Sequence, residues 1–259
     1  MYDKPLIHYP IGTLFLAGIR EILIITTPED LAAFQRLLGD GSQYGASFDY
    51  ATQEKPNGLA EAFIIGEKFI AGGNVSLILG DNIFHGVGLG RQLELIDTNE
   101  GATIFAYRVA DPERYGVVEF ADSGKVISIE EKPTKPKSNF AVPGLYFYDS
   151  QVVEVSKSIM PSKRGELEIT SVNDFYLSTG QLKTIILERG TTWLDTGTVE
   201  TLHAASTYVQ IIEERQGSKI SCLEEIAWQN RWISDSELEA LAYGYGSNPY
   251  GAYLQSLSR

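Results

Sequence analysis

The chain has 259 residues, with 34 acidic and 21 basic side chains and a formal net charge of −13. A nucleic-acid-binding surface or a surface that sits on an anionic membrane needs concentrated positive charge, so the acid excess argues against both partners. Hydrophobic residues make up 43% of the chain and charged residues 21%, a mixture typical of a folded globular protein.

The cysteine content and the absence of targeting signals indicate a cytoplasmic protein. Cys222 is the sole cysteine, so no internal disulfide forms, as is usual in a reducing compartment. No uncharged apolar run is long enough to span a bilayer, and residues 1–5 lack the basic and then apolar layout of a secretory signal.

The first part of the chain alternates short β-branched runs with amphipathic stretches, which is typical of an α/β fold with a mostly parallel sheet. The sequence predicts strands at 21–27, 48–51, 75–79 and 103–107, and helices at 28–38 and 58–69.

The pattern changes after residue 111. Hairpin-like strands at 116–120, 126–129 and 144–148 indicate a sheet extension within the α/β core. Strands at 184–187 and 193–195 are expected to return to the core, and helices follow at 199–214, 235–243 and the end of the chain. We therefore expect a single domain over 1–259, with an inserted sheet part at about 111–170 and a C-terminal helical part at about 199–259.

Two acidic side chains follow predicted strands, at the edge where parallel α/β sheets bind ligands. Asp81 comes after the 75–79 strand and Gly80, and Asp195 comes after Trp193 and Leu194. Two converging carboxylates suit Mg²⁺, which takes one or two carboxylates and keeps its other positions for substrate oxygens and water. On residue type alone, a turn and helix cap is favoured for Asp195, and an Asx-turn is as good an interpretation of Asp81 as a metal ligand.

A charged segment, 130–133, closes the 126–129 strand. Lys132 suits a phosphate as a point charge, and Glu131 can accept hydrogen bonds from sugar hydroxyls, although a solvated turn is the commoner use of such residues. The charges of 164–170 are similarly ambiguous, because they can simply cap the helix that follows. The sequence has no His-Cys cluster, nucleophile elbow or P-loop, so hydrolase, metalloprotease and P-loop functions are excluded.

Taken together, these segments resemble the bacterial glucose-1-phosphate thymidylyltransferases, which belong to the sugar nucleotidyltransferase family. The resemblance covers essentially the whole chain, and segments 114–120 and 213–217 are closest to the thymidylyl branch. The segments that carry it, in chain order, are 2–5, 16–22, 38–42, 58–60, 79–82, 111–117, 130–133, 164–170 and 193–198.

The resemblance implies a Rossmann-like α/β fold of the nucleotide-diphospho-sugar transferase type, with a mostly parallel mixed sheet flanked by helices. It implies transfer of a thymidylyl group from dTTP to α-D-glucose 1-phosphate, giving dTDP-glucose and pyrophosphate as the first step of dTDP-rhamnose biosynthesis. It also implies Mg²⁺ as cofactor and a cytoplasmic homotetramer. Catalysis would rest on positioning and charge neutralisation, without a protein nucleophile.

The resemblance also assigns residues. Asp81 and Asp195 would bind the metal and, with Lys132, form the catalytic set. Gln53, Gly58 and Asp81 would bind the nucleotide, and Arg189 and Gly190 would belong to a second, regulatory site. The residues expected to bind the sugar phosphate are Tyr115, Gly116, Glu131, Lys132, Val142, Tyr146 and Trp193.

Four departures from the family pattern stand out. Asn57 stands where the family has Asp, Pro143 stands where it has Thr, and Glu188 brings an acid to the regulatory site. The family's N-terminal strand, its glycine-rich loop and a later Lys are missing, so the resemblance implies an N-terminally truncated copy. Such a copy would have an exposed edge on the 22–26 strand and a rate lowered by about 10³-fold or more.

Two alternatives to the thymidylyltransferase interpretation are open at this point. One is a non-catalytic subunit that binds a nucleotide sugar or docks to a complete relative. The other is a uridylyltransferase, because few residues decide the choice of base.

Overall fold

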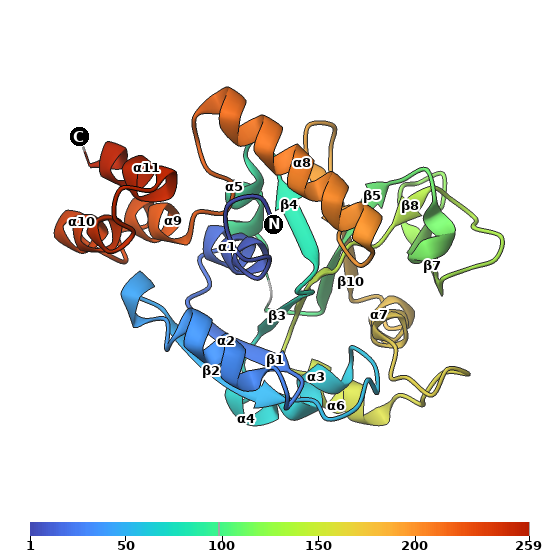
Figure 1. Ribbon diagram of the computed structural model, residues 1–259. Coiled ribbons are helices and arrows are strands. Elements are labelled where there is room, and N and C mark those ends of the chain that lie inside the picture. The colour runs from blue at the N-terminus through green and yellow to red at the C-terminus, as the bar shows by residue number, and fades with distance from the viewer. Residues whose placement is uncertain (98, 259) are drawn as a thin grey trace.

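The computed structural model describes residues 1–97 and 99–258, which form a mixed α/β structure with helices on both sides of the strands (Figure 1). The helices are α1 His8–Leu16, α2 Leu31–Leu38, α3 Glu61–Ile65, α4 Glu67–Ile70, α5 Leu89–Glu94, α6 Val152–Ser158, α7 Ile169–Ser178, α8 Val199–Gln216, α9 Leu223–Gln229, α10 Asp235–Gly244 and α11 Pro249–Leu257. The strands are β1 Glu21–Thr26, β2 Ser47–Thr52, β3 Val75–Ile78, β4 Asn82–His85, β5 Ala102–Arg108, β6 Gly116–Phe120, β7 Val126–Glu131, β8 Phe140–Ala141, β9 Leu145–Tyr148, β10 Leu182–Ile186 and β11 Thr192–Asp195.

The main sheet has seven strands in the order β3-β9-β5-β8-β6-β7, with β10 paired to β5. The expected α/β class with a mixed sheet is confirmed. The strands were expected to be mostly parallel, but most of the strand pairs are antiparallel. Parallel pairing among the described strands occurs between β1 and β2 and between β5 and β10, and the other pairs are antiparallel. Strands β6 to β9 take part in most of the antiparallel pairs; a short turn joins β6 to β7, and the other paired strands are farther apart in the sequence.

Two pairs of strands stand apart from the main sheet. Among the described strands β1 pairs with β2 alone, so the other edge of the 22–26 strand has no strand partner, as expected. β11 pairs with β4 and not with the core sheet, so the expectation that 193–195 is a core strand is wrong. The β4–β11 ribbon places Asp195 directly opposite Asn82, which joins the two chain segments that carry the candidate carboxylates.

The helix predicted at 58–69 is two short helices, α3 and α4, with a break at Gly66. A Cβ atom at Gly66 would lie 3.0 Å from the Ala62 carbonyl and 3.3 Å from the Leu23 side chain, so the glycine permits close packing against β1. No local pattern predicts α1, because this helix is buried on nearly all sides and therefore lacks a polar stripe.

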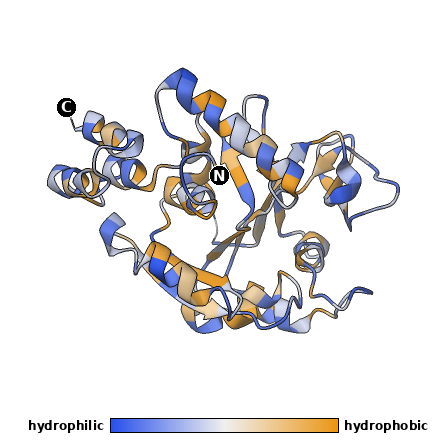
Figure 2. Ribbon diagram, viewed as in Figure 1, coloured by the Kyte–Doolittle hydropathy of each residue, from blue (hydrophilic) through white to orange (hydrophobic). Residues whose placement is uncertain are grey.

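Apolar packing surrounds the strands, and polar residues gather on the loops and outer helix surfaces (Figure 2). One buried cluster joins α1, β1 and β2 to the C-terminal helices α9 to α11, and another joins α6 and α7 to the main sheet. α8 crosses over β4 and β11, and the C-terminal helices lie at the opposite end of the molecule from β7 and β8 (Figure 1). In the described part of the chain, no helix is long and apolar enough to cross a membrane.

Candidate active site

A cavity of about 490 Å³ opens where β3, β6, β7, β11 and α7 approach one another. Its walls contain residues from segments that are distant in sequence, including the ends of β3 and β11. Nine residues predicted from the sequence line it: Asp81, Tyr115, Gly116, Glu131, Lys132, Val142, Tyr146, Trp193 and Asp195.

The two candidate metal ligands border the same small space. A Cβ atom at Gly197 would lie 3.2 Å from Asp195 Oδ1 and 3.5 Å from Asp81 Oδ2. The backbone N–H and the hydroxyl of Thr196 both donate to the Asp81 carbonyl, at 2.9 and 2.7 Å, and fix the two strand ends together. The glycine at 197 leaves open a space that a side chain would fill, with a carboxylate oxygen from each strand facing it.

Different residues form the turn after β11 and the N-cap of α8. The Asp195 Oδ1 accepts a hydrogen bond from the Gly197 N–H at 3.0 Å, so Asp195 forms the expected turn. Thr198 is the N-cap of α8, because its side chain accepts from the Thr201 N–H at 3.2 Å. The cap interpretation of Asp195 is therefore wrong, and its other carboxylate oxygen, Oδ2, lies 3.6 Å from Arg114 Nη2.

Asn82 fixes the floor of the cavity. Its buried Oδ1 accepts hydrogen bonds from Trp193 Nε1 at 2.6 Å and from the Gly144 N–H at 3.0 Å. Its Nδ2 donates to Asp81 Oδ1 at 2.8 Å. One amide thus orients the indole ring, the backbone before β9 and the first candidate metal ligand.

Glu131 and Lys132 lie at the end of β7, opposite Gly116 of β6. Glu131 Oε2 accepts a hydrogen bond from the Thr170 hydroxyl, and Arg164 Nη2 lies 3.8 Å from Glu131 Oε1. Lys132 has a left-handed backbone with φ of 43°, and its N–H donates to the Tyr115 carbonyl at 3.0 Å. The unusual turn brings an ammonium and a carboxylate to the same wall of the cavity.

Aromatic rings form the opposite wall. Tyr115 and Trp193 meet edge to face with ring centroids 4.9 Å apart. Burial, followed by the Asp195 carboxylate, raises the pKa of Tyr115 to about 12. Burial raises the pKa of Tyr146 above its ordinary value as well, and the charge of Glu131 adds to this. Both phenols therefore stay neutral and can donate hydrogen bonds at neutral pH.

Arg114 adds a cation that the sequence did not single out. Its Nη2 lies 3.6 Å from Asp195 Oδ2, and its Nη1 donates to Asp111 Oδ2 at 3.0 Å. The guanidinium carbon also lies 5.3 Å from the centroid of the Tyr115 ring. Nothing in the local sequence distinguishes Arg114 from a surface arginine; the contact with Asp195 depends on the fold.

The two predicted nucleotide residues other than Asp81 lie beside the cavity. Gln53 Nε2 donates to the Gly58 carbonyl at 3.2 Å and to Glu61 Oε2 at 2.6 Å, and neither Gln53 nor Gly58 contributes to the cavity lining. Gly58 has φ of 109°, and a Cβ atom there would lie 2.4 Å from the Leu167 carbonyl. Its neighbour Leu59 lines the cavity, so the segment reaches the site by that residue.

Asn57 and Pro143, the two residues that differ from the family pattern near the site, each take part in a hydrogen bond. Asn57 Nδ2 donates to Glu61 Oε1 at 2.8 Å, so Gln53 and Asn57 hold the two oxygens of one carboxylate. An Asp at 57 would place a second carboxylate against Glu61. Pro143 is buried beside the cavity, and its carbonyl accepts from the Leu145 N–H at 2.8 Å.

Arg189 and Gly190 lie in the β10–β11 connection, outside the cavity lining. A Cβ atom at Gly86 would lie 3.1 Å from the Gly190 carbonyl, so this connection packs against the turn that follows β4. The structure therefore separates the two predicted regulatory residues from the cavity residues.

The cavity also contains residues that the sequence interpretation missed. Asn82, Arg114, Thr170 and Gly197 all line it. All four lie within segments that carry the family resemblance, but their contacts involve other strands or helices, and sequence proximity alone does not reveal such contacts. In the described residues, no group of three or more His, Cys, Asp or Glu side chains forms a metal-binding cluster.

Comparison with known proteins gives consistent matches. A family profile described as nucleotidyl transferase matches residues 1–211. The glucose-1-phosphate thymidylyltransferase of Neisseria meningitidis is 56% identical over 258 residues, covering 99% of this chain and 90% of the relative. The protein of the same name from Mycobacterium tuberculosis is 52% identical over 257 residues, covering 99% of this chain and 89% of the relative.

Solved structures share the fold. A Bacillus anthracis structure in complex with a sucrose, provisionally named a glucose-1-phosphate thymidylyltransferase, superposes with a TM-score of 0.72 at 39% identity, over 79% of this chain and 82% of the other. A UDP-glucose pyrophosphorylase complexed with UDP-glucose superposes with a TM-score of 0.65 at 25% identity, over 80% of this chain and 86% of the other.

Proposed function

The chain belongs to the nucleotidyl transferase family, and on that premise we propose that it transfers a thymidylyl group from dTTP to α-D-glucose 1-phosphate. The products are dTDP-glucose and pyrophosphate, the starting point of dTDP-rhamnose synthesis. One observation carries the proposal. Two carboxylates, Asp81 and Asp195, face one space in a cavity that also contains the Glu131–Lys132 pair.

The space beside Gly197 fits a divalent cation. It is bordered by one carboxylate oxygen from each of two strands, and hard oxygen ligands are those that Mg²⁺ prefers. Asp81 and Asp195 would hold Mg²⁺, which when bound neutralises charge on phosphate oxygens. Asn82 orients Asp81 by donating to Oδ1, which leaves Oδ2 for the cation side.

The other wall suits a sugar phosphate. Lys132 would neutralise the phosphate, and Glu131, fixed by the Thr170 hydroxyl, would accept hydrogen bonds from sugar hydroxyls. Val142, Tyr146 and Trp193 would pack on the sugar ring. With the reactants held in line, the phosphate oxygen of the sugar attacks the α-phosphorus of the nucleotide, and pyrophosphate leaves.

Gln53 and Gly58 would face the thymine, with Leu59 closing the side of the cavity. We include in the proposal a homotetrameric state and a regulatory nucleotide site at Arg189 and Gly190. Glu188 would repel a phosphate there, so we expect weak feedback inhibition. Sedimentation velocity and a dTDP-rhamnose inhibition curve test these two points, and inhibition as strong as that of the Neisseria meningitidis relative would contradict the second.

Pyrophosphate release tests the proposed activity. The chain is incubated with Mg²⁺, glucose 1-phosphate and either dTTP or UTP, and binding of dTDP-glucose is measured in parallel by calorimetry. We expect release with dTTP to exceed release with UTP. A preference for UTP would make the chain a uridylyltransferase, and dTDP-glucose binding without release would favour a nucleotide-sugar-binding subunit.

The variant Asp195→Asn tests the role assigned to the Asp195 carboxylate in the same assay. Removing one of the two carboxylates that would hold Mg²⁺ weakens binding of the cation that neutralises phosphate charge in the transition state, so we expect release to fall at least 100-fold, or about 2.7 kcal/mol. Asp122→Asn, in the exposed β6–β7 turn, removes the same charge away from the cavity and should leave the rate unchanged. Equal rates in the two variants would contradict the assignment of Asp195.

A further inference from the structure

Asn173 of α7 lines the candidate active site, although the sequence interpretation assigned it no role. The residue is buried, with 1% of its surface exposed. Its Oδ1 accepts a hydrogen bond from the Tyr148 hydroxyl at 2.6 Å. With Oδ1 held in this way, the amide nitrogen Nδ2 is directed elsewhere, and it donates to no group among the described residues.

The free amide nitrogen is open to the cavity. A buried N–H group without an acceptor is unfavourable, so such groups are nearly always paired with protein, water or ligand. Within the described chain, the side-chain polar atoms that lack both a partner and contact with solvent do not include Asn173 Nδ2. Because Asn173 lines the cavity, an acceptor that enters the cavity can reach this nitrogen.

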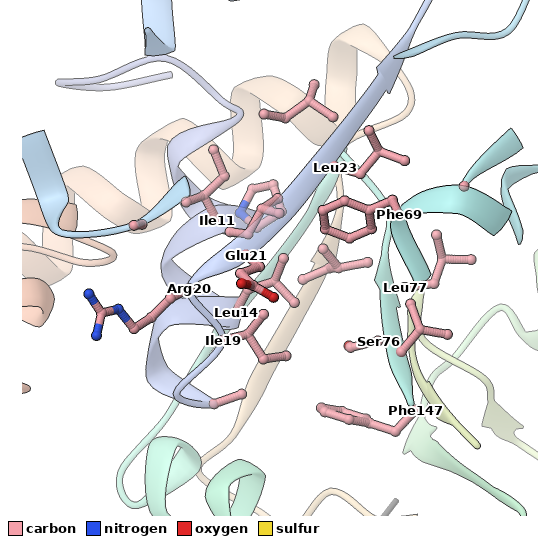
Figure 3. A pocket seen from close by; sticks show the side chains of 18 of the residues that line it. Ile11, Leu14, Ile19, Arg20, Glu21, Leu23, Phe69, Ser76, Leu77 and Phe147 are labelled. Carbon is pink, nitrogen blue, oxygen red and sulfur yellow. The ribbon is translucent and has the colours of Figure 1, made fainter. Parts of the chain in front are cut away.

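The strand β9 directs two tyrosines to the same part of the cavity. Phe147 and its cross-strand partner Ser76 line a separate pocket (Figure 3). Neighbours on a strand point to opposite faces, so Tyr146 and Tyr148 project from the other face of β9. Their rings are stacked with centroids 6.2 Å apart, and Tyr146 lines the cavity. Tyr148 therefore holds the Asn173 amide on the side of the cavity that Tyr146 borders.

This side of the cavity is remote from the candidate metal ligands. Tyr148 lies opposite Val75, at the start of β3, whereas Asp81 follows the end of that strand. The strand advances by about 10 Å between its first and fourth residues. The helix α7 also joins Asn173 to the wall proposed for the sugar, because Thr170, three residues earlier, donates to Glu131.

We infer that Asn173 is a specificity-determining residue, whose Nδ2 donates a hydrogen bond to a hexose hydroxyl on the side of the ring opposite C1. The inference rests on the proposed function, which places the phosphate on C1 against Lys132 and the metal ligands. The hydroxyls at C3, C4 and C6 are those on the far side of the ring. A sugar without the bonded hydroxyl leaves a buried donor unpaired, and a site built around a hydrogen bond rejects such an analogue strongly.

Tyr148 is a positioning residue in this arrangement, because it acts on the sugar through the amide of Asn173. Its hydroxyl donates to Oδ1 and thereby turns the donor side of the amide toward the cavity. Burial raises the pKa of Tyr148 well above its ordinary value, so the phenol keeps its proton and the orientation of the amide is fixed.

Binding of deoxy sugars tests the inference without reference to turnover. Calorimetry measures the affinities of the unaltered chain and of Asn173→Ala for dTDP-glucose and for its 2-, 3-, 4- and 6-deoxy derivatives. We expect the unaltered chain to bind one of the 3-, 4- or 6-deoxy derivatives at least about tenfold more weakly than dTDP-glucose. In Asn173→Ala that preference should fall below about threefold, and the preference over the 2-deoxy derivative should be the same in both chains.

Two further variants separate sugar recognition from a structural role. Tyr148→Phe removes the same hydrogen bond from Asn173 but keeps Nδ2 in the cavity, so it should keep a preference above about threefold. Asn230→Ala removes an amide that donates to the Phe15 carbonyl outside the cavity, and it should leave affinity and preference unchanged. If Asn173→Ala does not fold, a crystal structure of the unaltered chain with dTDP-glucose decides, with Nδ2 expected at about 3 Å from a sugar hydroxyl.

Several results would overturn the inference while dTDP-glucose binding leaves the proposed function standing. They are equal preferences in the unaltered chain and Asn173→Ala, an equal loss of preference in Tyr148→Phe, coupling of Asn173 to the 2-hydroxyl alone, and an Nδ2 beyond hydrogen-bond distance of every sugar oxygen. Failure of the unaltered chain to bind dTDP-glucose at all would instead contradict the proposed sugar site, and the inference with it.

Discussion

Asp81 and Asp195 reach one space from two strands, and Arg114 approaches the same carboxylate from a third segment. The Arg114 contact with Asp195, at 3.6 Å, is longer than the contact with Asp111, at 3.0 Å. The Arg114 side chain is 38% exposed, so its attraction to Asp195 is that of a surface ion pair, below about 1 kcal/mol. A cation bound by Asp195 would compete with this guanidinium.

Arg114→Ala is therefore expected to raise the affinity of the chain for Mn²⁺. The Arg114 guanidinium competes with the metal for Asp195 and repels it. If this effect is worth about 0.6 kcal/mol, its removal lowers the Kd for Mn²⁺ roughly threefold. The measurement is a Mn²⁺ titration followed by electron paramagnetic resonance, without substrates. Arg36→Ala, on the exposed surface of α2, removes the same charge and serves as the control. Unchanged or weaker Mn²⁺ binding in Arg114→Ala would contradict the competition.

We expect the Tyr115 phenol to lose its proton at a higher pH than an ordinary tyrosine. Burial and the nearby Asp195 carboxylate raise the pKa of its phenol from 10.0 to about 12. The unfolded chain deprotonates first, so the contribution of Tyr115 to stability is complete below pH 10 and is lost between pH 10 and 12. The difference between the ultraviolet titrations of the wild type and Tyr115→Phe should show one phenolate with a midpoint near 12. A midpoint near 10, or no downward shift in the Asp195→Asn background, would contradict this environment.

At the scale of elements, a buried ionic cluster fastens the segment before α1 to the C-terminal end of α8. Lys4 Nζ lies 2.6 Å from Asp3 Oδ1 and 3.0 Å from Glu213 Oε1, and Lys219 Nζ lies 2.8 Å from both acids. Burial acts to raise the pKa of Asp3, but hydrogen bonds from Lys219 and Lys4 outweigh it and lower the pKa below 3.8. The contribution of Asp3 to stability is therefore present above pH 3.8 and is lost as the pH falls further.

Lys4→Met should destabilise the fold strongly. Lys4 is 7% exposed and Glu213 is 4% exposed, so removing the lysine leaves buried carboxylates with one cation between them. Breaking a buried ion pair in this way costs about 3–5 kcal/mol. Urea unfolding followed by circular dichroism measures the change. Lys125→Met, in the exposed β6–β7 turn, should alter the unfolding free energy by less than about 0.5 kcal/mol, and a similar small value for Lys4→Met would show that the cluster is not coupled to folding.

The elements that sequence patterns predicted well are those with a clear local signal. β1, β2, β5 and α8 combine a β-branched run or an amphipathic period with a distinct start or stop, and their limits agree within about two residues. α1 and β4 were missed because their residues are buried on most sides, so no alternation of polar and apolar residues identifies them. The pairing of β11 with β4 depends on contacts across more than 100 residues, which no local pattern encodes.

At the scale of the whole molecule, the cavity residues were predicted from segments whose order resembles a known family. Composition and spacing alone favoured a cap or a turn at Asp195, and the fold gave the cap to Thr198. Arg114 and Thr170 lie in segments that carry the resemblance but were assigned no role there, and they act through partners on other elements. The sequence thus pointed to several polar groups that line the cavity, and the tertiary structure showed which contacts orient them.

The most direct test of the proposed active site is a crystal structure of the chain with Mn²⁺ and dTDP-glucose, using the anomalous signal of manganese. The expected map has one anomalous peak between Asp81 and Asp195, beside Gly197, with the glucose against Glu131 and the phosphate against Lys132. Manganese or nucleotide sugar bound elsewhere, with the 490 Å³ cavity unfilled, would contradict the assignment of the site.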